Sequence, residues 1–447
     1  MIVSMVSLGC AKNLVDAERM LHLLREEGHT LTVEPGDAEI AVVNTCGFIQ
    51  AAKEEAIETI LELVQLKAEG TLKHIIVTGC LAERYQQEMA EQFPEVDAVI
   101  GLGDEVKLCD VIKRIAAGER VVQFAPKQQL PLTGGRVIST LPFFAYLKIA
   151  EGCSNGCTYC AIPQIRGGYR SVPMEEVLKE AQWLAESGVT ELVVVAQDTT
   201  RYGEDLYGVS RLPQLLRALC QIEGFRWIRV LYCYPERISE ELIDVIATEP
   251  KIVKYLDVPI QHCSGSVLKA MRRSGDEESL SRLFAALRER IPGITLRTTL
   301  MTGFPGETEE DFEALSAFVE KMRFDRMGCF AYSEEEHTIA ASMPDQVEES
   351  VRQHRAELLT EQQMTISAAL NEARIGTVTE AVIEGYDKWA ECWFGRTAAD
   401  APDIDGKLFI PGTPADGYRV GQYVTVEIFD MLDFDLIGEV IAGESAE

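Results

Sequence analysis

Basic residues are scarce in this chain of 447 residues. Lys and Arg number 42 against 72 Asp and Glu, which gives a formal net charge of -30 at pH 7. A strongly acidic surface repels phosphate backbones and attracts basic partners. The composition therefore argues against a broad nucleic-acid surface and favours a basic partner.

The sequence predicts no signal peptide and no membrane span at its start. Its start, MIVSMVSLGC, has no basic residue, and its apolar run is too short for a signal peptide or a membrane span. Apolar residues make up 47% and charged residues 26%, as in ordinary globular proteins. We therefore expect a cytoplasmic protein without a membrane partner, and its length predicts more than one domain.

Alternating apolar and amphipathic segments predict an α/β fold with an open sheet domain in residues 1–124. The expected strands are 2–8, 40–44, 74–78 and 98–100. The expected helices are 14–27, 51–67, 83–92 and 106–117.

A linker at 125–138 leads to a second alternating series in residues 139–370. Its expected strands are AYLKIA, ELVVVAQD, WIRVLYCYP, YLDVPIQH, TLRTTLMTG and RMGCFAYS. Six such strand-helix repeats predict an incomplete (β/α)6 barrel, an open relative of the closed eight-stranded one. After a helix at 348–374, the runs TEAVIEGY and YVTVEIFD predict a small all-β module in residues 371–443.

Three cysteines that are distant in the sequence occupy equivalent places. Cys10, Cys46 and Cys80 each lie just past the carboxyl end of an expected parallel strand. In an open α/β sheet those ends share one edge, where ligands usually bind. A single cysteine of this kind is most simply a buried core residue, but three at equivalent positions favour a metal site.

Three further cysteines lie close together in EGCSNGCTYCAIP, at Cys153, Cys157 and Cys160. They follow the first strand of the second domain, where barrel enzymes keep their active sites. Zinc is the alternative, but a structural zinc takes four ligands, and no second CxxC or HxxxH follows. An iron-sulfur cluster fits three soft thiolates better and leaves one iron open for a substrate or cofactor.

The CxxxCxYC loop resembles that of the radical S-adenosylmethionine superfamily, and SLGCAKNLVDAE, NTCGFI and VTGC resemble the amino-terminal domain of its methylthiotransferases. The similarity continues through VVAQDTTRYG, YLDVPIQH, TGFPGETEEDF and DRMGCFAYS into a tail, with GRTAADAPDIDG, that is similar to a TRAM module. SLGC followed by KNLVDAE, together with NTCGFI, is similar to the RimO type. That type modifies an aspartate of the small-subunit ribosomal protein next to the decoding centre.

The resemblance implies two 4Fe-4S clusters, one on each set of three cysteines, with S-adenosylmethionine on the cluster of the second set. It implies that cleavage of this cofactor yields a radical that takes hydrogen from the β-carbon of the aspartate. The first cluster would then deliver a methylated sulfur, and a low-potential electron donor would supply the electron. The candidate contacts to S-adenosylmethionine are Tyr159, Gln197, Asp198, Gly303 and Gly306. For the two glycines a tight turn is an equally good interpretation.

The charge of the tail bears on the expected partner. Residues 371–447 contain five Lys and Arg against sixteen Asp and Glu. A module that grips transfer RNA should be basic, so an acidic TRAM module suits a basic ribosomal protein, and transfer RNA is not the expected partner. Two other functions stay open: a transfer-RNA methylthiotransferase, and a non-catalytic iron-sulfur protein that senses redox state or binds the ribosome.

Overall fold

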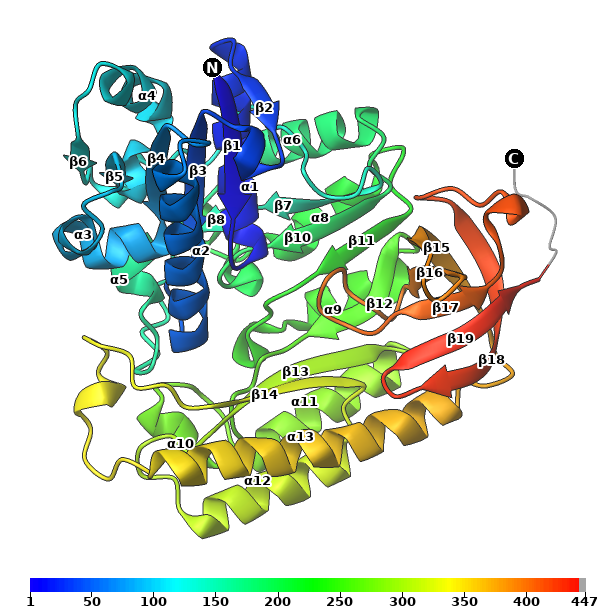
Figure 1. Ribbon diagram of the computed structural model, residues 1–447. Coiled ribbons are helices and arrows are strands. Elements are labelled where there is room, and N and C mark those ends of the chain that lie inside the picture. Colours follow the sequence, from blue (N-terminus) through cyan, green and yellow to red (C-terminus); the bar gives the residue numbers. More distant parts are fainter. Residues whose placement is uncertain (442–447) are drawn as a thin grey trace.

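The computed structural model describes residues 1–441, and its first sheet contains six parallel strands in the order β2-β1-β3-β4-β5-β6 (Figure 1). The strands are β1 (Ile2–Ser7), β2 (Thr30–Thr32), β3 (Ile40–Thr45), β4 (His74–Gly79), β5 (Ala98–Ile100) and β6 (Val121–Gln123). The helices are α1 (Ala11–Glu26), α2 (Gln50–Ala68), α3 (Cys80–Gln92) and α4 (Leu108–Ala116).

Helices cover both faces of this first sheet. Apolar residues of α2 and α3 pack on one face, and those of α1 and α4 pack on the other. The predicted open α/β sheet is therefore confirmed. The sequence pattern does not predict β2 and β6, because a strand of three residues carries no periodicity. Helices α1 and α3 begin three residues earlier than predicted, because the chain turns directly from strand to helix at Gly9 and Gly79.

The second sheet contains six parallel strands in the order β14-β13-β12-β11-β10-β7. They are β7 (Phe144–Lys148), β10 (Glu191–Val195), β11 (Trp227–Val230), β12 (Ile252–Asp257), β13 (Thr295–Thr302) and β14 (Arg326–Ala331). All the predicted strands of this domain are present, and the sheet is open between its edge strands β7 and β14, as an incomplete barrel should be. A short antiparallel pair, β8 (Ala150–Glu151) with β9 (Arg170–Ser171), was not part of the expected pattern.

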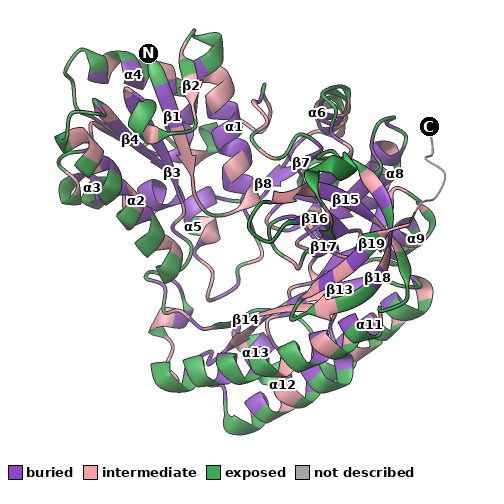
Figure 2. Cartoon of the chain, turned by 45° about the vertical axis from the view of Figure 1, so that its right-hand side comes forward, coloured by how far each residue is buried: buried purple, intermediate pink, exposed green. Residues whose placement is uncertain are grey.

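Most helices of the second domain pack against one face of its sheet, and Figure 2 shows the outer surfaces of α12 and α13 exposed. The helices are α5 (Ile162–Arg166), α6 (Met174–Glu186), α7 (Glu204–Tyr207), α8 (Leu212–Cys220), α9 (Glu240–Thr248), α10 (Gly265–Ala270), α11 (Glu277–Arg290), α12 (Glu309–Met322) and α13 (Glu349–Glu372). The long helix α13 corresponds to the helix expected at 348–374, and it leads into the last module.

The last module is a closed five-stranded barrel in the order β15-β16-β17-β19-β18. Its strands are β15 (Val378–Asp387), β16 (Cys392–Thr397), β17 (Leu408–Pro411), β18 (Tyr423–Leu432) and β19 (Asp435–Val440). The predicted small all-β module is confirmed, and its expected end at residue 443 lies outside the described residues.

The loop between β16 and β17 fixes this barrel to the inner face of the central sheet. The hydroxyl of Tyr255 donates to Oδ2 of Asp405 (2.6 Å), and Arg326 donates to Oδ1 of Asp400 (2.6 Å). Ala401 of the loop lies in one buried apolar cluster with residues of β7, β10, β11 and β12. Because Val15 of α1 joins the same cluster, all three domains meet on this face.

Candidate active site between two sets of cysteines

The first set of cysteines lies at one edge of the first sheet. Cys10 directly precedes α1, Cys46 directly follows β3, and Cys80 is the first residue of α3. The strands before them, β1, β3 and β4, are neighbours in the sheet, so the structure places these cysteines where the strand pattern predicts them. The backbone before Cys10 lies close to Cys46, because a Cβ atom added at Gly9 would lie 2.7 Å from Sγ of Cys46.

The second set, Cys153, Cys157 and Cys160, lies in the loop between β8 and α5. Backbone hydrogen bonds hold this loop in place. The N–H of Cys153 donates to the carbonyl of Gly167 (3.0 Å), and the N–H of Thr158 donates to the carbonyl of Met271 (3.1 Å).

The two sets lie on facing sides of one interface between domains. Cys80 packs in a single buried cluster with Ala161 and Ile165, which come shortly after Cys160 in the chain. Helices α3 and α5, which start beside the two sets, are in contact. The fold thus brings cysteines from two domains to one place.

The loop after β11 provides a second connection between the sets. The ring of Tyr232 lies against Lys12, with 3.5 Å between the ammonium nitrogen and the ring centroid, and Lys12 is two residues from Cys10. Two residues further along the loop, the hydroxyl of Tyr234 lies 3.1 Å from Sγ of Cys157. One short loop therefore contacts Cys157 of the second set and Lys12, a close neighbour in the sequence of Cys10 of the first set.

A buried network of charges fixes the two domains to each other at this interface. Arg166 donates to Oδ2 of Asp16 (2.9 Å) and to Oε2 of Glu151 (3.0 Å), and Lys148 binds the same two carboxylates. The four side chains are at most 1% exposed. Burial alone would raise the pKa of Glu151, but Arg166 and Lys148 hold it well below its ordinary value, so the Glu151 carboxylate stays charged beside the two cations.

The thiols are strongly influenced by burial. Burial raises the pKa of Cys80 and that of Cys160 to about 12 each. Burial also acts on Cys10, but the charges of Lys12 and Arg166 outweigh it and lower the pKa of that thiol. A buried thiol with a raised pKa is protonated at neutral pH and is a poor nucleophile, whereas a metal ligand must lose its proton when the metal binds.

The donor atoms fit iron-sulfur clusters better than single metal ions. Within residues 1–441, no three His, Cys, Asp or Glu side chains are arranged to hold one metal ion. A 4Fe-4S cube has a different requirement, because each thiolate binds its own iron at a separate corner. Each set supplies three soft sulfur donors, and all twelve cysteines of the chain are free of disulfides.

Two of the candidate cofactor contacts follow β10. The side-chain nitrogen of Gln197 donates to Glu151 (3.2 Å), while its buried oxygen has no hydrogen-bond partner among the described residues. The carboxylate of Asp198 accepts hydrogen bonds from Asn155 (2.8 Å) and Thr200 (2.5 Å). Asp198 thus anchors the loop of the second set, and Gln197 is the one of the pair that offers a ligand an unused acceptor.

The other candidate contacts differ in their surroundings. Tyr159 packs at the margin of the core of the central domain. Gly303 has φ of +71°, and a Cβ atom there would lie 2.2 Å from Cγ of Arg352, which supports the tight-turn interpretation. Gly306 also has a positive φ, but nothing lies within 4 Å of the place its Cβ would take. Their roles in binding S-adenosylmethionine remain predictions.

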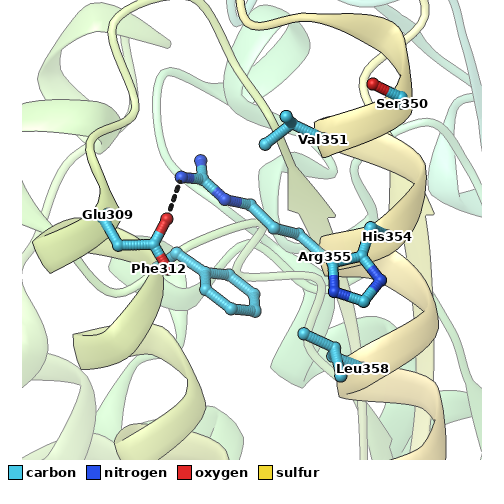
Figure 3. Close-up of a pocket in the computed structure, with 7 residues that line it drawn as sticks. All are labelled: Glu309, Phe312, Ser350, Val351, His354, Arg355 and Leu358. Atoms are coloured by element: carbon cyan, nitrogen blue, oxygen red, sulfur yellow. Dashed lines mark hydrogen bonds and ion pairs between the residues drawn. The ribbon is translucent and has the colours of Figure 1, made fainter.

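A separate cavity of about 490 Å³ lies between α12 and α13 (Figure 3). Arg355 extends into it from α13 and donates to Glu309 of α12 (2.7 Å). The residues that line it are Glu309, Phe312, Ser350, Val351, His354, Arg355 and Leu358. None of the candidate site residues is among them, so this cavity is not part of the cysteine site.

Sequence reasoning missed several residues of the site. Lys12 and Arg166 are close in the sequence to Cys10 and Cys160, and this closeness could have identified them as residues of the site. Tyr232 and Tyr234 are far in the sequence from both sets of cysteines, and Arg273, whose guanidinium lies 4.2 Å from the centroid of the Tyr234 ring, follows α10. Only the fold brings these residues to the site.

Three family descriptions match successive parts of the chain: Uncharacterized protein family UPF0004 at residues 3–101, the Radical SAM superfamily at 147–319 and the TRAM domain at 375–441. Curated proteins called ribosomal protein uS12 methylthiotransferase RimO match almost all of it. The protein from Lachnoclostridium phytofermentans is 49% identical over 98% of this chain and 99% of its own. The chain belongs to the RimO family. Other RimO proteins, from Trichlorobacter lovleyi and Clostridioides difficile, are 47% and 46% identical, with 98% of both chains covered in each case.

Solved structures of other radical S-adenosylmethionine enzymes share the fold of this RimO-family chain. The methyltransferase TsrM from Kitasatospora setae, with tryptophan and a cofactor analogue bound, has a TM-score of 0.55 and 16% identity over 73% of this chain and 72% of its own. The cobalamin-dependent enzyme OxsB has a TM-score of 0.51 and 15% identity, with 82% and 57% covered. Within the described residues of our chain, no helix is long and apolar enough to cross a membrane.

Proposed function

We propose that this RimO-family chain attaches a methylthio group to the β-carbon of an aspartate in ribosomal protein uS12. The observation that carries the proposal is the meeting of two sets of three cysteines, contributed by two domains, at one interface. A reaction that breaks a C–H bond at one centre and brings sulfur from another requires both centres within reach of one carbon atom. The family names point to the same activity.

In this proposal, each set of cysteines holds one 4Fe-4S cluster, and S-adenosylmethionine binds at the second set. When bound, these groups supply the one-electron chemistry that breaks an unactivated C–H bond and the sulfur that replaces the hydrogen. The protein's task is positioning. The ion pairs of Arg166 and Lys148 hold the two domains together, Asp198 fixes the loop of the second set through Asn155, and Gln197 offers a buried acceptor to a donor group of the cofactor.

We further propose that uS12 docks on the acidic all-β module. Part of the acidity of this module is not available to a partner, because Glu384 pairs with Arg396 and Asp400 pairs with Arg326 inside the protein. The hairpin of β18 and β19 differs, since three of its five acidic residues are exposed and lie among exposed apolar ones. The exposed residues of this docking hairpin are Thr425, Phe429, Asp430, Leu432, Asp433, Phe434 and Glu439. Such a surface suits a basic protein that also offers apolar contacts.

The remaining parts of the proposal concern the cell. The reaction needs a low-potential electron donor, and we propose that the chain acts in the cytoplasm, where ribosomal proteins are available. Transfer RNA is not the proposed substrate, because the all-β module offers an acidic rather than a basic surface.

Iron content and product analysis test the function together. The wild type and a Cys153→Ala, Cys157→Ala, Cys160→Ala variant are reconstituted anaerobically, with a Cys109→Ala, Cys329→Ala variant as the control for cysteines outside the site. We expect about eight irons in the wild type and the control, and about four in the site variant. After addition of reductant and S-adenosylmethionine, mass spectrometry of uS12 should show the methylthio group only with the wild type and the control. Modification of transfer RNA in place of uS12 would contradict the proposal.

The docking hairpin is tested separately by binding. Neutralising Asp430, Asp433 and Glu439 as amides should weaken the binding of uS12 and flatten its salt dependence, because exposed charge pairs are screened by salt. A variant with Glu278→Gln, on the exposed surface of α11, serves as the control. Unchanged affinity in the hairpin variant would rule out this docking surface.

A further inference from the structure

Lys12 is a buried cation without a carboxylate partner. Its residue is 7% exposed, and among residues 1–441 no Asp or Glu oxygen lies within 4.0 Å of its ammonium nitrogen. The other buried cations of this interface, Lys148 and Arg166, are each paired with both Asp16 and Glu151. A largely buried ammonium is stabilised by a counterion. Because the neighbouring Cys10 sulfur is bound to iron in the proposed function, a carboxylate that arrives with a ligand can pair with this ammonium.

The position of Lys12 identifies where that ligand would lie. Lys12 is two residues from Cys10 of the first set, in the first turn of α1. Its ammonium group rests on the ring of Tyr232 at 3.5 Å, and the same loop carries Tyr234, whose hydroxyl lies 3.1 Å from Sγ of Cys157 in the second set. The ammonium group is therefore placed where the surroundings of the two sets meet.

We propose that Lys12 binds the side-chain carboxylate of the target aspartate. This inference rests on the proposed function, in which the β-carbon of that aspartate reacts. The carboxylate carbon is bonded directly to the β-carbon. An ion pair between Lys12 and the carboxylate therefore also positions the reacting β-carbon. The ring of Tyr232 contacts the ammonium group, so a carboxylate cannot approach that group from the side that the ring covers.

The ion pair also explains why the site would accept aspartate and not asparagine. Asparagine has the same shape and the same β-carbon as aspartate but no negative charge, so it leaves the buried ammonium unpaired. A site that loses the partner of a buried charge discriminates strongly against the neutral analogue. Lys12 is thus the residue that makes the site select aspartate over asparagine.

The test measures binding rather than turnover. Wild type, Lys12→Met, Lys12→Gln and, as a control, Lys113→Met are reconstituted anaerobically with iron and sulfide and used without reductant. Their affinities for isolated uS12, and for uS12 with the target aspartate replaced by asparagine, are measured by calorimetry with S-adenosylmethionine present. We expect the wild type and the control to prefer the aspartate form by roughly tenfold to a hundredfold, and both neutral Lys12 variants to bind the two forms alike with unchanged iron content.

Other results overturn the inference in distinguishable ways. If either neutral variant keeps the preference for aspartate, Lys12 does not bind the carboxylate. If the neutral variants lose iron and keep the preference, Lys12 serves as a counterion to the first cluster instead. A wild type that modifies uS12 but binds both forms equally refutes this inference alone, whereas a wild type that does not modify uS12 refutes the proposed function.

Discussion

Replacing Asp16 with Asn tests whether the buried charge network holds the first two domains together. Asp16 on α1 accepts from Arg166 of α5 at 2.9 Å and also binds Lys148 of β7, and all three side chains are at most 1% exposed. Asn has the same shape but leaves two buried cations with only Glu151 as a counterion. Breaking a buried ion pair typically costs about 3–5 kcal/mol. Because the amide oxygen can still accept one hydrogen bond, we expect a loss near the lower end, about 3 kcal/mol.

Urea unfolding of the reduced, metal-free chain at pH 7 measures this loss. The denaturant dependence is up to about 3 kcal/mol per M for small proteins and is larger for longer chains, so a loss of about 3 kcal/mol lowers the unfolding midpoint by up to about 1 M. The matched control is Glu27→Gln, which removes an acid that pairs with Lys113 (2.6 Å) at the exposed end of the same helix. The control should unfold like the wild type. An Asp16→Asn midpoint equal to that of the control would refute the argument that this network joins the domains.

Three further predictions concern single side chains. Tyr234→Phe removes a hydrogen bond of about 1 kcal/mol to Cys157, so a redox titration should show the potential of the second cluster lowered by about 40 mV, and an unchanged potential would count against that contact. Gln197→Ala should weaken S-adenosylmethionine binding with iron content unchanged, whereas loss of iron would show a structural role. Burial raises the pKa of Glu105 well above its ordinary value, so stability falls as pH rises above about 4.5, where only the unfolded state releases the proton. Glu105→Gln should reduce this fall of the urea midpoint as pH rises above about 4.5, and an unaltered pH slope would disprove it.

The acidity of the all-β module illustrates what composition can and cannot tell. Residues 371–447 contain an excess of carboxylates, but a count from the sequence does not distinguish buried carboxylates from exposed ones. In the structure, Asp400 and Asp405 face arginine and tyrosine side chains of the central sheet and fix the module in place. Only the exposed carboxylates can attract a basic partner, and the barrel places three of them, Asp430, Asp433 and Glu439, on the β18–β19 hairpin.

The sequence by itself determined the order of the three domains, the strands that form the two parallel sheets, and the two sets of cysteines. These features follow from periodicity and spacing, which are local properties. Cys46 can be placed at a strand end because buried strands read as continuous apolar runs. The sequence could not reveal β6, which is too short to show a period, nor the start of α3 at Cys80.

Only the tertiary structure decided which residues surround those cysteines. The contacts of Lys12 with Tyr232 and of Tyr234 with Cys157 join segments that are far apart in the chain. The pairing of Asp16 with Arg166 likewise depends on how one domain packs on the other. Side chains brought together by packing share no spacing in the sequence, because their distance is set by the fold and not by the length of chain between them. The cysteines were therefore readable in the sequence, whereas the unpaired ammonium group beside them became visible only once the domains were in contact.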